Sequence, residues 1–573
     1  MSSNSPARLS LAIASLLATP GLSGAEPPVL ETLHAFAIPA NSSENPARNP
    51  FGGLVLAGDG NLYGTTSEGG GFYDSGQYHR GTLFRLTPTG EVTTVHAFAV
   101  TSPSGWWPNG QLCVANDSTL YGVTLYGGTD PTGLGTGTIF SFSLPAGGFA
   151  QRASFFSGTS GSLGGSRYGL VQGNDGRFYG LAGGGAYSEE LPGRAPQASG
   201  SVYAVTTNGV FSILRSFAGG VAGAAVPPNV PEGTYPKGQL VKGPGGHFYG
   251  VTAFDGLNGH GTCFRITADG ELTTIAAFNG RNGSRPEAGL IWGTDGNLYG
   301  ATSGGGTVTN DAGTGFGTVF KLSPTGELST LHSFDYFNDG SLPQAELVEK
   351  NGAFYGSTRG GPISTIFRVS ANGDFAKLAE FPSAGGVDDN VSKLTVGSDG
   401  NLYGTIAMGG PLGGGTVFRI NLPGPPTITD DPSSQTVAPG SPVTFSVTAT
   451  GASPLRYQWT KEGTVLPGQT NVTLTLNHAQ VTDVGGYAVN VSNLGGSATS
   501  KSAVLSLLNL DVYPGLTIVG RVGARYRIDY SLEVDAANWL PLTEVDLPVT
   551  PYTFGDFTAP ANAKRFYRAV LVQ

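Results

Sequence analysis

The chain has 573 residues, of which 40 are acidic and 30 basic, giving a formal charge of −10. One hydrophobic core rarely serves so long a chain, so about two to four domains are expected. A negative surface repels phosphate backbones, so nucleic acid is not an expected partner. Glycine and proline are abundant, at 92 and 38 residues, but the apolar residues fall in short alternating runs between turn residues, which predicts an all-β protein.

The N-terminus has the pattern of a secretory signal peptide. Arg8 precedes an apolar run over residues 9–18, and the small residues Ser23 and Ala25 follow. We therefore predict that residues 1–25 are removed and that the mature protein is exported, either secreted or held at the cell surface. The apolar run is too short to span a bilayer and no other stretch approaches the roughly 20 apolar residues needed, so no integral membrane segment is predicted.

Seven copies of a phrase ending in Tyr-Gly occupy the following residues. They are Tyr63-Gly64, Tyr121-Gly122, Tyr179-Gly180, Tyr249-Gly250, Tyr299-Gly300, Tyr355-Gly356 and Tyr403-Gly404. Each copy lies within four strand-sized segments, which in the first copy are residues 53–56, 61–66, 81–86 and 92–98. Four short antiparallel strands, repeated every ~50 to 70 residues, predict the blades of a β-propeller.

Short turns alternate with long connections in every copy. The first two segments are joined by Asx-Gly pairs, which suit two-residue hairpins: Asp59-Gly60, Asp175-Gly176, Asp295-Gly296, Asn351-Gly352 and Asp399-Gly400. The connections from the second to the third segment and from blade to blade are long and differ between copies. In an antiparallel meander they emerge on one side, which we call the variable face.

The two ends of the repeat region complement each other. The seventh copy stops at Ile420 without a fourth segment, whereas residues 30–36 match the fourth segment of the fifth copy, residues 328–334. We therefore predict that residues 29–36 complete the last blade and close a seven-bladed β-propeller over residues 29–422.

These phrases, Asp-Gly-Asn-Leu-Tyr-Gly-Thr and Gly-Thr-Val-Phe, resemble the tandem GloVer repeat of exported bacterial proteins described as choice-of-anchor. The resemblance covers about two thirds of the chain. It implies a surface or secreted protein whose C-terminal region varies with the mode of attachment, and it supplies no catalytic residues.

Two further β domains are predicted after a proline-rich hinge. Residues 427–508 resemble an immunoglobulin-like sandwich, with Trp459 as the buried strand tryptophan and Tyr487 in a tyrosine-corner phrase. Val447 and Val489 stand where the inter-sheet cysteines would be. Residues 509–573 alternate again and predict a small β-sandwich, which is either a sorting or attachment module or a structural cap.

The sequence contains no pattern typical of a metal, cofactor or nucleophilic site. His34, His96 and His332 occupy equivalent repeat positions, which favours packing, and each Asp turn offers one carboxylate, too few for calcium. Cys113 and Cys263 lie in copies that are not neighbours and are interpreted as buried thiols. The repeated cations Arg85, Arg265, Lys321, Arg368 and Arg419 are expected to stack on a neighbouring blade or to pair with acidic turns.

Aromatic side chains in the variable-face connections are the candidate ligand-binding residues, because flat rings suit sugars and partner proteins. They are Trp106, Trp107, Tyr126, Tyr187, Phe254 and Tyr336. The sequence favours a non-enzymatic surface protein for adhesion, with a carbohydrate or protein ligand. Two alternatives remain open: a polysaccharide-active hydrolase or lyase with paired carboxylates in the propeller funnel, and a structural coat protein.

Overall fold

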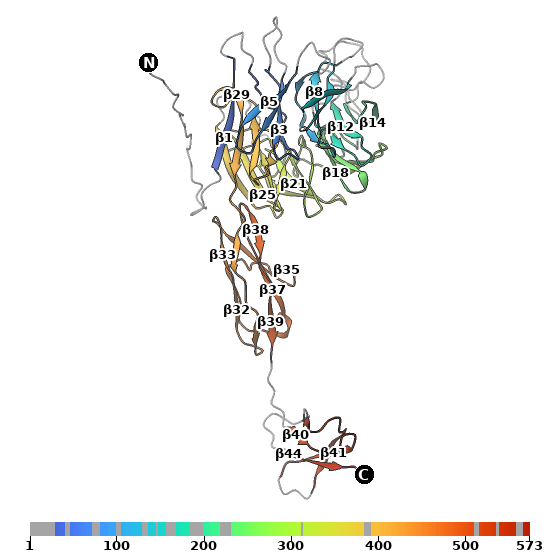
Figure 1. Cartoon of the computed structure of the whole chain (residues 1–573), viewed down its shortest axis with the longest axis vertical. Helices are drawn as coiled ribbons and strands as arrows, with labels where there is room; N and C mark the ends of the chain where they lie inside the picture. The colour runs from blue at the N-terminus through green and yellow to red at the C-terminus, as the bar shows by residue number, and fades with distance from the viewer. Residues whose placement is uncertain are drawn as a thin grey trace, which may run out of the picture. The chain divides into compact units, whose positions relative to one another are not determined.

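The computed structural model is built almost entirely of β-strands (Figure 1). It describes residues 29–39, 46–70, 81–98, 105–128, 136–144, 147–155, 168–183, 199–217, 231–310, 313–382, 391–508, 515–533, 538–556, 558 and 565–572. Across these ranges the only helices are two 3-10 turns, Pro244–Gly246 and Val481–Asp483. The predicted all-β class is confirmed. The predicted signal peptide, residues 1–25, lies outside the described residues.

Seven antiparallel sheets follow one another along the repeat region, and each contains one Tyr-Gly phrase. Sheets 1 to 3 contain β2 (Leu54–Leu56), β3 (Leu62–Thr66), β4 (Thr82–Leu86) and β5 (Val92–Ala97); β6 (Trp106–Pro108), β7 (Cys113–Val114), β8 (Leu120–Tyr126), β9 (Thr138–Ser143) and β10 (Gly148–Ser154); and β11 (Val171–Gln172), β12 (Phe178–Gly183), β13 (Gly200–Val205) and β14 (Phe211–Phe217).

Sheets 4 to 7 repeat the pattern. They contain β15 (Thr234–Lys242), β16 (Phe248–Phe254), β17 (Thr262–Ile266) and β18 (Leu272–Ala277); β19 (Ile291–Trp292), β20 (Leu298–Thr302), β21 (Thr318–Leu322) and β22 (Leu328–Ser333); β23 (Val348–Lys350), β24 (Ala353–Ser357), β25 (Ile363–Ser370) and β26 (Phe375–Pro382); and β27 (Thr395–Val396), β28 (Leu402–Ile406), β29 (Gly413–Asn421) and β1 (Val29–Ala37).

The first strand of the chain lies in the seventh sheet, beside β29 (Figure 1). β1 pairs antiparallel with β29 from Val29 opposite Asn421 to Ala37 opposite Gly413. Glu31 also accepts a 2.6 Å hydrogen bond from the Arg419 guanidinium. Seven hydrophobic cores each join two consecutive sheets, and one of them joins sheet 7 to sheet 1 through Tyr403, Val417 and Leu54.

The two residues of the Tyr-Gly phrase have different roles in this packing. The ring of Tyr299 stacks on Phe354 of the next sheet at 3.7 Å between centroids, and its hydroxyl donates to Asp295 in its own turn. A Cβ on Gly300 would lie 2.6 Å from Cζ of Phe320, the aromatic of its own third strand. The tyrosine therefore links sheets, while the glycine leaves room for the ring beneath it.

Paired hydroxyl groups fasten the second and third strands of a sheet near the variable face. Thr66 and Thr82 lie 2.7 Å apart between their Oγ1 atoms, and Thr302 and Thr318 lie 2.8 Å apart. All four side chains are buried, so each hydroxyl needs a partner inside the protein. This explains the threonine that ends the Leu-Tyr-Gly-Thr-Thr type of strand.

Contact clustering divides the chain into two units. Unit 1 holds Met1–Ile428, Ala449–Arg456 and Val491–Ala498, and unit 2 holds Thr429–Thr448, Tyr457–Asn490 and Thr499–Gln573.

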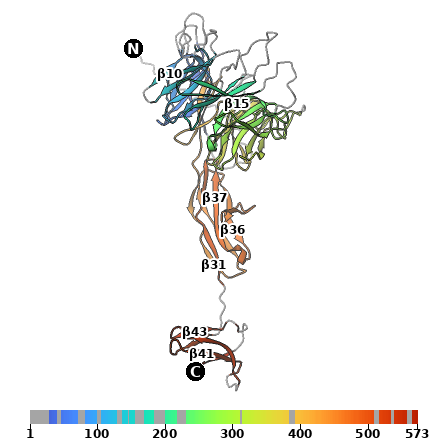
Figure 2. The same cartoon turned by 90° about the vertical axis from the view of Figure 1, so that its right-hand side faces the viewer.

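The immunoglobulin-like region is a sandwich, part of which is labelled in Figure 2. Its strands are β30 (Thr427–Asp430), β31 (Gln435–Val437), β32 (Val443–Ser446), β33 (Thr448–Thr450), β34 (Arg456–Lys461), β35 (Thr464–Val465), β36 (Thr473–Leu476), β37 (Gly485–Asn493), β38 (Gly496–Thr499) and β39 (Ala503–Leu507). Trp459 is fully buried and Tyr487 donates its hydroxyl to the carbonyl of Asp483 at 2.7 Å. Val447 and Val489 are buried, so apolar packing replaces the usual disulfide.

The C-terminal residues form two small sheets. Strands β40 (Gly515–Ile518) and β43 (Tyr552–Gly555) make one, and β42 (Leu540–Asp546), β41 (Arg525–Ser531) and β44 (Phe566–Leu571) make the other. Ile518, Ile528 and Leu547 form their core. Beside it the carboxylate of Asp556 is 1% exposed and accepts hydrogen bonds from Arg565 and Tyr567.

Candidate functional site

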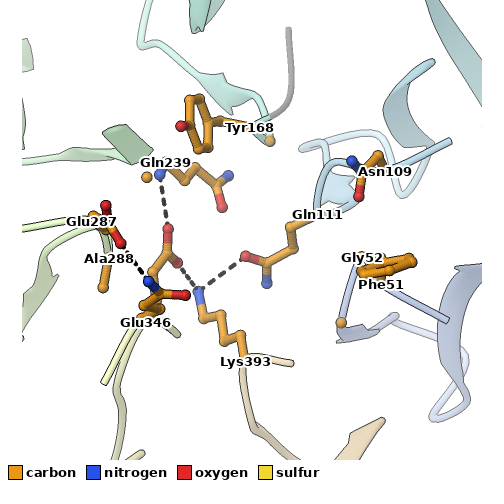
Figure 3. Close-up of a pocket in the computed structure, with 15 residues that line it drawn as sticks. Phe51, Gly52, Asn109, Gln111, Tyr168, Gln239, Glu287, Ala288, Glu346 and Lys393 are labelled. Carbon is orange, nitrogen blue, oxygen red and sulfur yellow. Dashed lines mark hydrogen bonds and ion pairs between the residues drawn. The ribbon is translucent and has the colours of Figure 1, made fainter. Parts of the chain in front are cut away.

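All seven sheets contribute to one cavity in unit 1 (Figure 3). Five of them lead into it with the same phrase, a proline four residues before a buried leucine, as in Pro286 and Leu290. The leucine anchors the start of the first strand, so the residues just before it line the cavity. Its volume is about 160 Å³, and its lining residues are Phe51, Gly52, Gly53, Asn109, Gln111, Tyr168, Gly169, Gly238, Gln239, Glu287, Ala288, Gly289, Gln344, Glu346 and Lys393.

A charged network crosses the cavity. The ammonium group of Lys393 donates to Oε2 of Glu346 at 2.6 Å and to Oε1 of Gln111 at 3.3 Å. The other oxygen of Glu346 accepts from the backbone N–H of Gln239 at 2.8 Å, and the Gln239 amide donates to the carbonyl of Leu170 at 2.6 Å. These bonds join sheets 2, 3, 4, 6 and 7 across their common centre.

Glycines give this network its room. A Cβ on Gly289 would lie 2.3 Å from Oε1 of Glu346, and a Cβ on Gly169 would lie 3.0 Å from Cδ of Gln239. Large polar side chains and glycines therefore occupy the same repeat position in different sheets, so that the long side chains of some sheets reach over the short ones of others.

A second carboxylate lies nearby. Glu287 accepts from the Gln344 amide at 2.5 Å and, through its other oxygen, from the Arg285 guanidinium at 3.3 Å. The carbonyl of the same Gln344 side chain accepts from Arg359 at 3.1 Å. Each carboxylate oxygen of Glu287 and Glu346 thus accepts from a donor within the protein, an arrangement that suits cross-linking of the sheets better than proton exchange with a substrate.

A left-handed residue precedes the proline in five sheets. Asn49, Trp107, Tyr235, Arg285 and Leu342 have φ between 55° and 62°, although the position before a proline normally favours extended backbone. Hydrogen bonds hold the conformation: the N–H of Arg285 donates to His260 of the preceding sheet at 3.0 Å, and its carbonyl accepts from Ser303 at 3.0 Å. The backbone is thus shared, while the side chain differs in every sheet.

Three of the predicted ligand-binding residues meet in one cluster on the variable face. Trp106 stacks on Tyr126 with centroids 4.6 Å apart and planes at 24°, and on Trp107 at 6.5 Å and 21°. Both indoles are partly buried and Tyr126 is 37% exposed. Trp107 and Tyr126 lie 5.6 Å apart with their planes tilted by 44°, so the three rings form one aromatic cluster with Trp106 at its centre, at one corner of sheet 2.

Phe254 and Tyr336 belong to separate clusters. Phe254 packs edge to face against Tyr235 at 5.5 Å, and Arg285 lies over its ring at 5.3 Å. Tyr336 packs against Phe316 and Phe337, the latter 75% exposed. Tyr187 lies outside the described residues.

Other residues singled out in the sequence have structural partners. The His96 and His332 rings stack on Phe149 and Phe375 of the following sheets at 3.7 and 3.8 Å. Lys321 pairs with Asp295 at 2.8 Å, and Arg419 lies 3.9 Å from Asp399. Burial raises the pKa of the Cys113 thiol to about 11, as expected of an unreactive cysteine.

No group of three or more potential metal ligands occurs among the residues that the structure describes. In the same part of the chain, no helix is long and apolar enough to cross a membrane.

Sequence reasoning missed the cavity residues and the left-handed positions. Counting back from the buried leucine would have aligned Gly53, Gln111, Gly169, Gln239, Gly289, Glu346 and Lys393. Their alternation of glycine with long polar residues is the signal that could have revealed a shared centre. The left-handed positions have no such signal, because their residue types have nothing in common except the proline that follows.

The Gloeobacter/Verrucomicrobia repeat matches this chain over residues 27–230 and 235–452. The chain belongs to this repeat family. An immunoglobulin domain also matches, over residues 425–493, which confirms the predicted immunoglobulin-like region. The repeat family thus accounts for the seven sheets that contain the Tyr-Gly phrases. The last residue matched by either family is residue 493, in the immunoglobulin domain.

Individual proteins that resemble this repeat protein match smaller parts of the chain than the repeat family does. A decoration protein of Escherichia phage T5 is 40% identical over 74 residues, which are 12% of this chain and 45% of the phage protein, less than two thirds of its length. A Bacteroides uniformis protein provisionally assigned as a 6-phosphogluconolactonase is 16% identical, with a TM-score of 0.37 over 56% of this chain and 84% of its own. Titin domain M7 is 26% identical, with a TM-score of 0.14 over 15% of this chain and 97% of its own.

Proposed function

We propose that this repeat protein is a non-enzymatic surface protein that binds carbohydrate or protein ligands through its variable face. The observation that carries the proposal is the cluster of Trp106, Trp107 and Tyr126, in which Trp106 packs on both other rings and all three rings are partly exposed. Flat aromatic surfaces of this kind suit sugar rings and the anchor residues of partner proteins. The two carboxylates of the central cavity are engaged in hydrogen bonds and ion pairs within the protein, which favours a structural role for them over an enzymatic one.

The seven sheets are interpreted as the blades of a closed seven-bladed β-propeller over residues 29–422. The pairing of β1 with β29, the core between sheets 7 and 1, and a cavity lined by all seven sheets support this interpretation. Residues 427–508 would then form the immunoglobulin-like spacer and residues 509–573 a terminal module for attachment. Deletion of residues 29–36 tests the closure, because it should lower the melting temperature strongly; an unchanged value would contradict it.

Export through a signal peptide over residues 1–25 is part of the same proposal. N-terminal sequencing of the protein recovered from outside the cell should begin at Glu26. A mature chain that retains residues 1–25, or that stays inside the cell, would contradict export.

A structural coat is a second candidate, supported by the likeness to a phage decoration protein over 74 residues. Sedimentation and electron microscopy of the purified protein would distinguish it. Ordered arrays formed by the protein alone favour a coat, whereas a monomer that binds ligand favours the leading proposal.

The leading proposal is tested by a glycan array combined with polysaccharide degradation assays. Trp107→Ala should abolish binding to the glycans that the native chain recognises, with the melting temperature retained. Trp539→Ala removes an indole from the C-terminal module and serves as the matched control. Turnover of a polysaccharide, lost when Glu287 or Glu346 is replaced by glutamine, would instead establish the hydrolase or lyase alternative.

A further inference from the structure

One corner of the variable face combines two rings and a cation. Tyr235 and Phe254 of sheet 4 are 45% and 37% exposed and pack edge to face at 5.5 Å. Arg285, which leads into sheet 5, places its guanidinium 5.3 Å from the centre of the Phe254 ring, with 54% of its side chain exposed. The corner therefore presents two adjacent aromatic surfaces and a cation to solvent together.

The backbone at this corner is fixed in an unfavourable conformation. Tyr235 and Arg285 have φ of 57° and 56°, and Asp255, next to Phe254, has φ of 58°. A left-handed conformation costs roughly 1–2 kcal/mol for a residue other than glycine, and three occur here. Backbone groups of His260 and Ser303 hold the backbone of Arg285, while its side chain makes one long ion pair with Glu287. The strain at Tyr235 and Arg285 belongs to the shared backbone of the repeat, and it fixes where these two side chains emerge.

The guanidinium keeps most of its hydrogen-bonding capacity. Within the described part of the chain its one hydrogen bond goes to Glu287, at a long 3.3 Å. Glu287 meanwhile accepts a shorter bond of 2.5 Å from Gln344, so the glutamate is held mainly by another residue. An arginine has five N–H donors in a planar fork, which matches the two oxygens of a carboxylate.

We propose that Tyr235, Phe254 and Arg285 form a subsite for a carboxylated sugar, such as a uronic acid unit of an acidic polysaccharide. The sugar ring packs on the exposed rings, and its carboxylate accepts two hydrogen bonds from Arg285. The inference rests on the proposed function, since it names the class of ligand that binds at one corner of the variable face. It is independent of the Trp106, Trp107 and Tyr126 cluster in sheet 2.

The formal charge of −10 predicts how this recognition behaves. Long-range repulsion slows the approach of an anionic chain, so the subsite has to act through short-range, charge-assisted hydrogen bonds. Salt screens the repulsion over about 8–10 Å while affecting the close pair less. Moderate salt should therefore strengthen the association slightly, unlike the steep loss seen for polycations that bind polyanions.

The test compares acids with their esters. Full-length protein would be titrated with tetrasaccharides of galacturonate, guluronate and glucuronate, and with the same compounds as methyl esters, which keep the ring and lose the charge. At least one acid should bind about tenfold tighter than its ester, and Arg285→Gln should remove that difference. Arg281→Gln removes an exposed charge from the same connection and is the matched control. Tyr235→Asn, which keeps a residue that tolerates positive φ, should weaken acid and ester alike.

The outcomes separate the two proposals. Equal affinity for acids and esters, or a preference that survives Arg285→Gln, overturns the subsite while leaving glycan binding intact. Binding of neutral glycans alone, sensitive to Trp107→Ala, does the same. If the array shows no glycan binding and a protein partner is captured instead, the carboxylated-sugar subsite is wrong and the protein-ligand form of the proposed function stands.

Discussion

Tyr299 donates its hydroxyl hydrogen to Oδ2 of Asp295 at 2.8 Å, so the ring that packs on the next sheet also holds the tight turn of its own sheet. The same bond recurs between Tyr63 and Asp59, at 2.8 Å, and between Tyr403 and Asp399, at 2.9 Å. Turn chemistry and packing between sheets therefore depend on one residue pair.

Replacing Asp295 tests that dependence. The carboxylate also accepts from the Asn297 N–H and from Lys321, so Asp295→Ala should lower the free energy of unfolding by about 1–3 kcal/mol. The side chain is 37% exposed, which favours the lower half of this range because solvent screens the lysine pair. Chemical denaturation measures the change. Asp269→Ala, an exposed aspartate in a neighbouring Asp-Gly turn, is the control and should change stability by less than ~0.5 kcal/mol.

The glycine of the Tyr-Gly phrase is expected to tolerate no side chain. A Cβ at Gly300 would lie 2.6 Å from the Phe320 ring and 3.0 Å from Leu290, both buried. Gly300→Ala should therefore destabilise the protein by about 1–3 kcal/mol or more through overpacking. Gly424→Ala, where a Cβ would meet nothing within 4 Å, should be close to neutral in the same thermal melt.

The central ion pair should show strong coupling. Lys393 and Glu346 are 23% and 11% exposed, so Lys393→Met leaves a carboxylate partly buried without its cation and should cost about 2–4 kcal/mol. The double variant with Glu346→Gln should recover about 1–3 kcal/mol of that loss in a double-mutant cycle. Lys501→Met, which removes an 87% exposed lysine paired with Asp431, should change stability by under ~1 kcal/mol. Additive effects at Lys393 and Glu346 would contradict the coupling.

Strain at the left-handed positions predicts an unusual order of stabilities. Leu342 has φ of 55° and is 40% exposed. Asparagine tolerates this conformation and a β-branched residue does not, so Leu342→Val should be about 1–2 kcal/mol less stable than Leu342→Asn. Hydrophobicity alone predicts the reverse. At the exposed Leu412 neither change meets a positive φ, so there the asparagine variant should have no such advantage.

Acid should loosen the C-terminal sheets when Asp556 becomes protonated. Burial would raise the pKa of Asp556, but hydrogen bonds from Thr558, Tyr567 and Arg565 outweigh it and lower the pKa to about 2. A folded-state pKa below the unfolded value near 4 contributes stability above pH ~4, which is lost as the pH falls toward 2. Hydrogen exchange of peptides from residues 515–572 in the full chain should accelerate over that interval.

Two variants check the origin of this acid effect. Asp556→Asn should make exchange fast already at neutral pH and remove the step between pH ~4 and 2. Asp546→Asn, at a 62% exposed side chain, should leave the step in place. A step that persists in Asp556→Asn would assign it to another carboxylate.

Sequence reasoning succeeded where one physical requirement repeats. Tyr-Gly, the Asx-Gly turns and Trp459 each serve the same packing or backbone need wherever they occur, so the all-β class, the repeat family and the immunoglobulin-like region were predictable from the letters alone. The aromatic cluster was partly predictable as well: Trp106 and Tyr126 were both singled out, but only the fold brings residues of β6 and β8 side by side.

The cavity residues and the left-handed positions could not be predicted from the sequence, because both depend on how residues of different sheets align in space. Nothing in the sequence near Gln111, Glu346 and Lys393 marks them as special. Their shared role in lining one cavity becomes visible only when the sheets are aligned on the buried leucine that follows each of them. The left-handed residues Tyr235 and Arg285 donate their backbone N–H groups to the preceding sheet, to Oγ of Ser199 at 3.3 Å and to the carbonyl of His260 at 3.0 Å, and both partners are distant in the sequence. Tertiary hydrogen bonds here override the local preference of a residue before proline.

The position of β1 also constrains the order of assembly. Glu31 and Arg419, which join β1 to β29, are 388 residues apart in the chain. During synthesis the earliest strand must wait without a partner until almost the whole repeat region has been made, and its unpaired edge is a hazard for association with other chains throughout that interval. The seventh sheet is therefore completed in one late event, so any factor that keeps the nascent chain extended would favour correct pairing of β1 with β29 over premature pairing.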